Sequence, residues 1–184
     1  QKHGVQKLKV TVQKDGKYYN VIANVLVVTK EFSDIDTLTA ALTPTEGNSV
    51  VYGYYRLAKD LTYGGWYTVG YAAKWTAVQR SNPELGFRGT LDGNGKTFTS
   101  WFYGDGLFGV VGKGAVIKNL TVNAYGYADG RTVLARTIRD AVVENVKINI
   151  ISGESDSYLT EGGIITALMS HSTVYRNVEI NSDG

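Results

Sequence analysis

The stretch "AVIKNLTVN", Ala115 to Asn123, occurs twice more in altered form, as "AVVENVKIN" at 141–149 and "TVYRNVEIN" at 173–181. All three share the pattern small, Val, any residue, charged, Asn, apolar, any residue, aliphatic, Asn. The central Asn recurs at intervals of 26 and 32 residues, which lies within the range of stacked repeat proteins. The pattern predicts one repeat for each turn of a solenoid. The central residues are Asn119, Asn145 and Asn177.

The spacing of the apolar residues within a repeat predicts a corner. In a flat strand, Ala115 and Ile117 would face one side and Leu120 and Val122 the other, because side chains alternate. A bend at the central Asn keeps all four inside, and Asn tolerates the left-handed backbone conformation better than other non-Gly residues. We therefore expect the three Asn residues to form corners that lie one above another.

The outward positions of the repeats support this register. If the repeats stack, the residue before the central Asn forms one column and the residue two positions after it forms a second. The first column is Lys118, Glu144 and Arg176, and the second is Thr121, Lys147 and Glu179. Neighbours alternate in sign or pair a charge with a neutral group, as adjacent parallel strands favour.

A second apolar strand lies about a dozen residues before each central Asn, at 106–111, 132–137 and 162–169. Two short strands per repeat, separated by Gly, Ser and Asn, are typical of a β-solenoid. Upstream, "GTLDGNGKT" at 89–97 lacks the spacing of a phosphate-binding loop and the ligands of a calcium loop. We expect 92–95 to form a tight turn whose glycines adopt positive φ.

The N-terminal part predicts a different arrangement. Strand-like segments at Lys7–Gln13 and Tyr18–Thr29 flank Asp15-Gly16, a strong signal for a β-hairpin. Strand character is then lost, and Asp34 or Asp36 could cap a short helix at 37–42 before Pro44. The expected organisation is a hairpin or partial immunoglobulin-like segment at 1–33, a linker at 34–50 and the solenoid at 51–184.

Composition limits the classes of partner. The 184 residues carry a net charge of only +2, and 43% are hydrophobic, enough for a core. The basic residues are dispersed, so no nucleic acid partner is expected. No apolar run approaches the roughly 18–20 residues of a membrane-spanning helix, so no membrane insertion is expected. Cysteine is absent, which excludes disulfides and Cys-ligated zinc, and the sequence predicts no cofactor.

Three segments together carry a family resemblance: "YYRLAKDLT", "GFRGTLDGNGKTFT" and "GLFGVVGKGAVIKNLTV". They resemble the opening coils of right-handed parallel β-helices in bacterial cell-surface proteins, including the GLUG-type repeats, and the resemblance extends from Tyr52 to Asp183. Residues 8–29 resemble the closing strands of a bacterial immunoglobulin-like module. "TVLARTIRD" departs from the family's Gly-rich pattern. The resemblance implies an all-β fold and a secreted or cell-surface stalk or adhesion module that contacts a glycan or a host protein.

Parallel β-helices also include pectate lyases and polygalacturonases, so the alternative is a polysaccharide-degrading enzyme or its substrate-binding domain. Glycoside hydrolysis needs two carboxyl groups about 5–10 Å apart. The outward columns offer Glu144 and Glu179 singly, each expected beside a basic residue, and we assign no catalytic residue.

Other polar groups have two interpretations: the group Arg136, Arg139 and Asp140 could bind an acidic sugar or form a loop salt bridge. The loop carboxylates could bind Ca²⁺ or stay solvated, and we predict no metal site; they are Glu154, Asp156 and Glu161. Neither histidine, His3 or His171, has a partner at ligand spacing.

Aromatic residues give the strongest candidate binding site. Flat aromatic rings beside polar loops can stack on the C–H faces of sugars, and exposed Tyr and Trp also form protein-binding hot spots. The alternative is that the tryptophans cap the open N-terminal end of the solenoid. The candidates are Trp66, Trp75, Trp101, Tyr125 and Tyr127.

Overall fold

The computed structural model describes residues 2–42, 50–66, 86–101, 106–125, 132–151, 163–169 and 172–182. Side chains are described throughout these ranges except at 64–66, 101 and 167–169. This part of the chain is mostly β-structure and forms three sheets, with the single helix α1 at Ile35–Leu42. One sheet is a two-stranded antiparallel hairpin, and the other two are parallel sheets of seven and five strands. The all-β prediction is confirmed.

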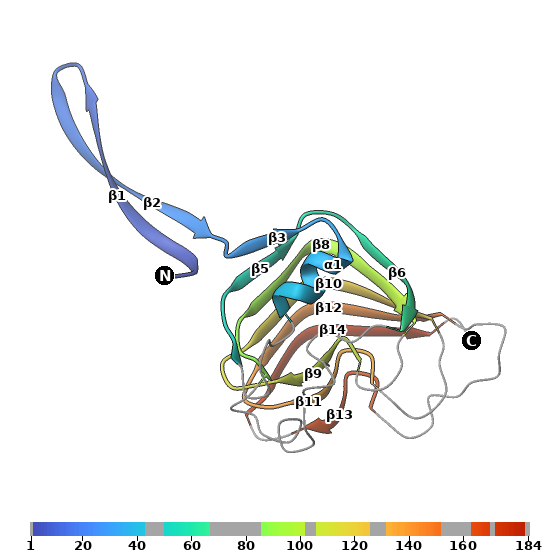
Figure 1. Cartoon of the computed structure of the whole chain (residues 1–184). Coiled ribbons are helices and arrows are strands. Elements are labelled where there is room, and N and C mark those ends of the chain that lie inside the picture. The colour runs from blue at the N-terminus through green and yellow to red at the C-terminus, as the bar shows by residue number, and fades with distance from the viewer. Residues whose placement is uncertain are drawn as a thin grey trace.

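The hairpin consists of β1 (Gly4–Lys14) and β2 (Lys17–Val27), paired without interruption. Its two-residue turn has positive φ at Asp15 (51°) and Gly16 (73°), as the right-handed twist of a tight hairpin favours. Figure 1 shows this hairpin projecting away from the parallel sheets. The predicted hairpin is confirmed, and its assignment to an immunoglobulin-like module stays a prediction.

The two parallel sheets are built by a chain that alternates between them. The larger sheet has the strand order β14-β12-β10-β8-β5-β3, with β6 also paired to β8, and the smaller has the order β13-β11-β9-β7-β4. From β7 onward each strand lies beside the previous strand of its own sheet, so successive passes stack in sequence order (Figure 1). The larger sheet contains β3 (Lys30–Phe32), β5 (Tyr54–Leu57), β6 (Leu61–Trp66), β8 (Thr90–Trp101), β10 (Val116–Tyr125), β12 (Val142–Ile151) and β14 (Val174–Ser182). The smaller contains β4 (Val50–Val51), β7 (Gly86–Phe87), β9 (Phe108–Val111), β11 (Ala135–Ile138) and β13 (Thr166–Met169).

The predicted Asn corners are present. Asn119, Asn145 and Asn177 have φ of 52°, 53° and 47°, in the left-handed region. Asn145 Nδ2 donates a hydrogen bond to Asn119 Oδ1 at 3.1 Å, and Asn177 Nδ2 donates to Asn145 Oδ1 at 2.9 Å. The flanking residues stay in register between β10, β12 and β14. The corner therefore stacks from strand to strand through a ladder of side-chain amides.

The region 92–95 differs from the expected tight turn. Strand β8 runs through it, and the register moves from Asp92 opposite Lys118 to Lys96 opposite Leu120. Two additional residues are thus accommodated at the corner as a bulge. Gly95 has the predicted positive φ of 73°, but Gly93 does not. Gly93 is required because a Cβ there would lie only 2.6 Å from Leu120 Cα.

One hydrophobic cluster joins both parallel sheets and the helix. Asp34 begins α1, since the Thr37 N–H donates to Asp34 Oδ1 at 2.7 Å, which settles the choice between the two predicted capping residues. Leu38 and Leu42 on α1 are 1% exposed and pack into the same cluster as Phe32. The division into domains stays a prediction, but 34–42, expected to belong to a linker, contributes to the core.

Candidate functional site

Three of the five aromatic candidates occupy neighbouring register positions where strands β6, β8 and β10 end. Trp66 pairs with Trp101, and Trp101 pairs with Tyr125. The strand ends lie on the same side of the sheet in Figure 1. The next position, on β12, is Ile151, so the aromatic row ends there. Trp75 and Tyr127 lie outside the described residues.

The alternation of β10 places Tyr125 on the outward face of the larger sheet. Leu120, Val122 and Ala124 are buried in the core, so Tyr125 lies on the opposite face from them. Adjacent strands are about 4.8 Å apart, close to the width of one sugar ring. We name the register positions of Trp66, Trp101 and Tyr125 the aromatic row.

A second ladder of amides lies two residues before the aromatic row. Asn149 Nδ2 donates to Asn123 Oδ1 at 2.8 Å, and Asn181 Nδ2 donates to Asn149 Oδ1 at 3.0 Å. At the other end, Asn123 Nδ2 donates to Thr99 Oγ1 at 3.4 Å. The sequence analysis assigned no role to these residues. The Asn that ends each repeat could have indicated the ladder, because it recurs at the same repeat position. The ladder places a polar strip beside the aromatic row.

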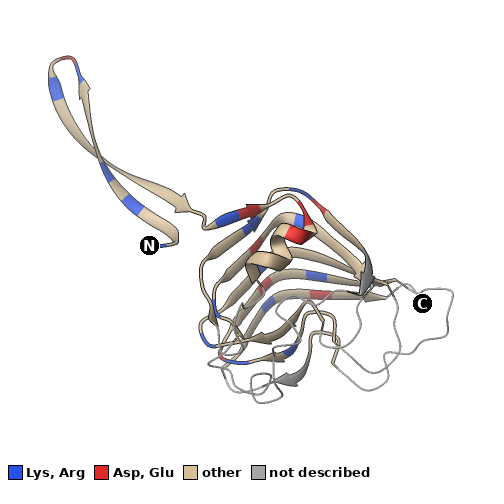
Figure 2. Ribbon diagram, in the orientation of Figure 1, with Lys and Arg blue, Asp and Glu red and all other residues tan. Residues whose placement is uncertain are grey.

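Charged residues form a column across the larger sheet at the position before the first Asn ladder. The predicted three-residue column is confirmed, and the strand register extends it over three more strands. Signs alternate at every step, and Figure 2 shows acidic and basic segments on neighbouring strands of this sheet. The column is Glu31, Arg56, Asp92, Lys118, Glu144 and Arg176. Its ion pairs are Arg56–Glu31 (2.5 Å), Lys118–Asp92 (3.9 Å) and Arg176–Glu144 (3.4 Å).

The second predicted column is also confirmed, since Thr121 pairs with Lys147 and Lys147 with Glu179. Lys147 Nζ lies 3.1 Å from Glu179 Oε1. Hydrogen bonds from Asn181 and Lys147, with the charge of Lys147, lower the pKa of the Glu179 carboxyl. Glu144 likewise has Arg176 beside it. A general acid that works near neutral pH needs a raised pKa, so these surroundings disfavour that role.

Asp92 anchors the corner of β8 within a buried polar network. Tyr54 Oη donates to Asp92 Oδ2, while Asp92 Oδ1 accepts hydrogen bonds from Asn94 N at 2.9 Å and Asn119 Nδ2 at 3.0 Å. The Asn119 contact joins the first Asn ladder to this carboxylate. Lys118 Nζ lies 5.4 Å from the centre of the Tyr54 ring and approaches the carboxylate as well.

The network sets the protonation of both acidic groups. Burial acts to raise the pKa of the Asp92 carboxyl, but the hydrogen bonds it accepts and the charge of Lys118 lower it overall. Burial, together with the bond to Asp92, raises the pKa of the Tyr54 hydroxyl. Asp92 therefore stays ionised and Tyr54 neutral near neutral pH. Sequence reasoning did not find this role, although aligning Asp92 with the charged column would have indicated it.

The remaining candidates do not gather into a described site. Asp140 has a positive φ of 50° in the bend between β11 and β12, and its carbonyl accepts a hydrogen bond from Gly114 N at 2.9 Å. Arg136 lies in β11, and Arg139 N donates to Val111 O at 3.0 Å. His3 Nδ1 lies 3.0 Å from Thr29 Oγ1, which ties the hairpin to the sheet. The other candidates fall outside the described residues; they are Glu154, Asp156, Glu161 and His171.

The described ranges contain no group of three or more His, Asp or Glu side chains placed to hold a metal ion. Within the same ranges, α1 is too short to cross a bilayer, and no other helix occurs.

Comparison with protein-family models, with curated proteins and with solved structures finds no match to this chain.

Proposed function

We propose that this chain is a non-catalytic extracellular module of a bacterial surface protein, built as a right-handed parallel β-helix and contacting glycans through the aromatic row. The alternation of the chain between two parallel sheets supports the β-helix. The resemblance of 52–183 to cell-surface repeats supports the extracellular location and the stalk or adhesion role.

The aromatic row is the observation that carries the proposal. Three aromatic residues occupy adjacent register positions where β6, β8 and β10 end, and Tyr125 lies on the outward face of the sheet. The strip formed by Asn123 and Asn149 beside it supplies amides that can hydrogen-bond sugar hydroxyls. A polysaccharide chain lying across the strands would meet an aromatic face and a polar strip together.

The charged columns support a binding module over a polysaccharide-degrading enzyme. Each carboxylate of the two columns lies beside a basic residue in register, and Asp92 and Glu179 have lowered pKa values. An enzyme would need two carboxyl groups across one cleft with separated pKa values. Release of reducing ends from a polysaccharide by the purified chain, abolished by Glu144→Gln or Glu179→Gln, would overturn the non-catalytic proposal.

A glycan array with the intact chain tests the proposal directly. Tyr125→Ala and Trp101→Ala should each reduce binding of a retained glycan by about tenfold, the value of one lost stacking contact of roughly 1–1.5 kcal/mol. Tyr52→Ala is the matched control, since Tyr52 is 56% exposed and lies away from the row. Circular dichroism separates the two interpretations of the tryptophans: unfolded Trp66→Ala and Trp101→Ala variants would support a cap. Absence of binding to any glycan would refute the glycan contact.

A further inference from the structure

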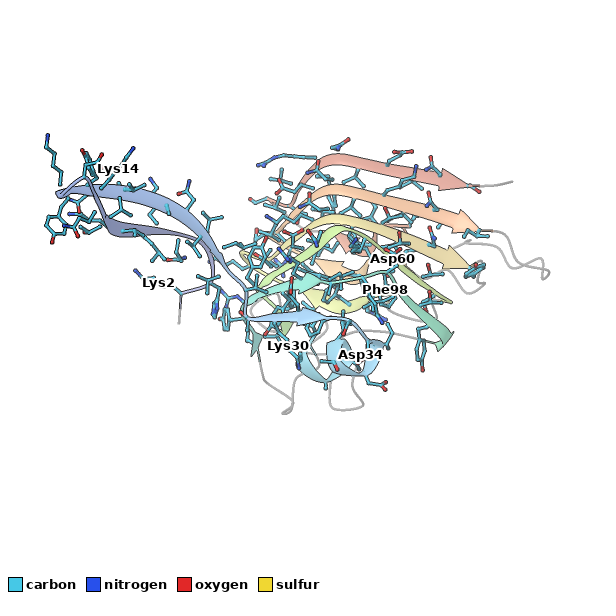
Figure 3. The ribbon with its side chains drawn as sticks, turned by 90° about the horizontal axis from the view of Figure 1, so that it is seen from above. Lys2, Lys14, Lys30, Asp34, Asp60 and Phe98 are labelled. Carbon is cyan, nitrogen blue, oxygen red and sulfur yellow. The ribbon has the colours of Figure 1, made fainter. Side chains whose placement is uncertain are left out.

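The outward face of the larger sheet carries a column of neutral polar side chains beside the aromatic row. Strand register places Thr99 on β8 opposite Asn123 on β10, followed by Asn149 on β12 and Asn181 on β14. Figure 3, in which the ribbon keeps the colours of Figure 1, shows these parallel strands side by side. Both chain neighbours of Asn123 are buried, so Asn123 faces away from the core. We name the positions of Thr99, Asn123 and Asn149 the polar strip.

The amides of the polar strip have donors that the second ladder leaves unused. Asn123 Nδ2 donates to Thr99 Oγ1 and Asn149 Nδ2 donates to Asn123 Oδ1, which uses one of the two hydrogens of each amide. The second hydrogen of each has no partner among the described residues. Asn181 differs, because its Nδ2 donates both to Asn149 Oδ1 and to Glu179 Oε1. The unused donors therefore lie on β10 and β12, and the ladder holds the two amides in the same orientation.

The columns on either side of the polar strip are uncharged on β10. Thr121 lies in one of them, with Thr97 opposite it on β8, and Tyr125 lies in the other. On β12 the first of these columns continues with Lys147, whose Nζ lies 3.1 Å from Glu179 Oε1. Among the described side chains of these columns, the one basic group is thus already paired with a carboxylate. A carboxylate or sulfate on a ligand would find no free cation in these columns.

We propose that the polar strip binds a neutral, extended, β-linked glycan whose chain lies across the strands. The inference rests on the glycan contact proposed above and specifies the class of glycan. Adjacent strands are about 4.8 Å apart, and an extended β-1,4-linked chain advances by close to this distance with each sugar, so every strand meets one sugar. An α-1,4-linked chain coils and loses this match after one or two strands.

The contacts follow from the groups that the strip leaves open. Sugar hydroxyls accept the unused hydrogens of Asn123 and Asn149 and donate to the oxygens of Thr99 and Thr121. The ring of Tyr125 offers an aromatic face to the C–H groups of a sugar on β10. Every contact of this kind is made by a neutral group, which is why we expect an uncharged glycan.

Three hexasaccharides that differ from one another in linkage or charge supply the test. Cellohexaose is neutral and extended, maltohexaose has the same glucose units in α-1,4 linkage, and cellohexaose oxidised at C6 keeps the extended chain but has carboxylates. Each is titrated against the full chain by isothermal titration calorimetry at low salt. Cellohexaose should bind about tenfold more tightly than either of the others, because each mismatch leaves one or two hydrogen bonds unmade. Equal or tighter binding of maltohexaose or of the oxidised chain would overturn the inference and leave the glycan contact standing.

Variants locate the binding to the polar strip. Thr121→Val keeps the shape of the side chain and removes a hydroxyl that has no partner among the described residues, so it should weaken cellohexaose binding about three- to tenfold. Asn123→Ala removes the central amide and should weaken binding further, with circular dichroism to verify that the variant folds. Thr90→Val is the matched control, because Thr90 lies on β8 before the corner and outside the strip.

The outcomes separate this inference from the proposed function. Unchanged binding in both Thr121→Val and Asn123→Ala, or an equal loss in Thr90→Val, would overturn the placement of the glycan on the polar strip. If neither these hexasaccharides nor any glycan on the array binds, the glycan contact itself fails and the inference fails with it.

Discussion

Replacing Asn145, the middle residue of the first Asn ladder, tests the reasoning about the corners. Its side chain donates to Asn119 Oδ1 and accepts from Asn177 Nδ2, and its backbone has φ of 53°. The ladder makes two demands at this position, one on the side-chain amide and one on the left-handed backbone. Asn145→Ala loses the side-chain amide and also places a residue that disfavours the left-handed conformation at this position. Asn145→Gly loses only the amide, because Gly adopts positive φ readily.

The two contributions can be estimated separately. A hydrogen bond contributes about 0.5–1.5 kcal/mol net, and because Asn145 is exposed we assign the two bonds about 1–2 kcal/mol together. A left-handed conformation costs Ala about 1–2 kcal/mol, a penalty that Gly does not carry. We expect Asn145→Ala to lower the free energy of unfolding by about 2–4 kcal/mol and Asn145→Gly by about 1–2 kcal/mol.

Urea denaturation followed by circular dichroism measures both values, with thermal unfolding as a second readout. At about 2–4 °C per kcal/mol for a chain of this size, Asn145→Ala should lower Tm by roughly 5–15 °C. Asn24→Ala on the exposed hairpin is the control and should change stability by less than about 0.5 kcal/mol. Equal losses for the Ala and Gly variants would refute the left-handed corner, and losses below about 0.5 kcal/mol in both would refute the ladder.

Three other predictions concern the corner, the core and pH. Gly93→Ala should destabilise the chain by more than Gly95→Ala. A Cβ at 93 would clash with the backbone at Leu120, whereas a Cβ at 95 would meet no atom within 4 Å, so Gly95→Ala has only the cost of placing Ala at positive φ. The urea midpoints of the two variants measure the difference. Ile148→Ala should cost about 2–5 kcal/mol and its register partner Ile180→Ala less than half as much, since only Ile148 is fully buried; similar losses would contradict this difference in burial. The lowered pKa of Asp92 contributes stability that is fully present above the ordinary pKa of an Asp and is lost as pH falls through the lower value in the folded protein. When Tm is measured as a function of pH, the Asp92→Asn variant should therefore lose less stability below about pH 4 than the unchanged chain. If Tm falls equally in both chains, Asp92 does not cause the loss of stability in acid.

Local patterns predicted the features that depend on neighbouring residues. The Asp15-Gly16 hairpin, the helix capped by Asp34 and the left-handed corner at Asn119 all follow from short-range backbone preferences. The aromatic row was recognised only as scattered aromatic residues, because the register that places Trp66 beside Trp101 depends on the pairing of strands far apart in the chain. The requirement for glycine at position 93 could not be predicted locally either, because the atoms that leave no room for a Cβ belong to a strand more than twenty residues away.

By itself, the sequence determined the repeat, its corners and the signs of the charged columns, because alternation and the conformational tolerance of Asn are properties of a few consecutive residues. Only the tertiary structure decided that Asp92 anchors the first ladder, that α1 packs into the core and that Ile148 is buried while its register partner Ile180 is exposed. These features depend on which strands become neighbours across loops of unequal length. Burial and hydrogen bonding are properties of that assembled neighbourhood, so no single repeat contains them.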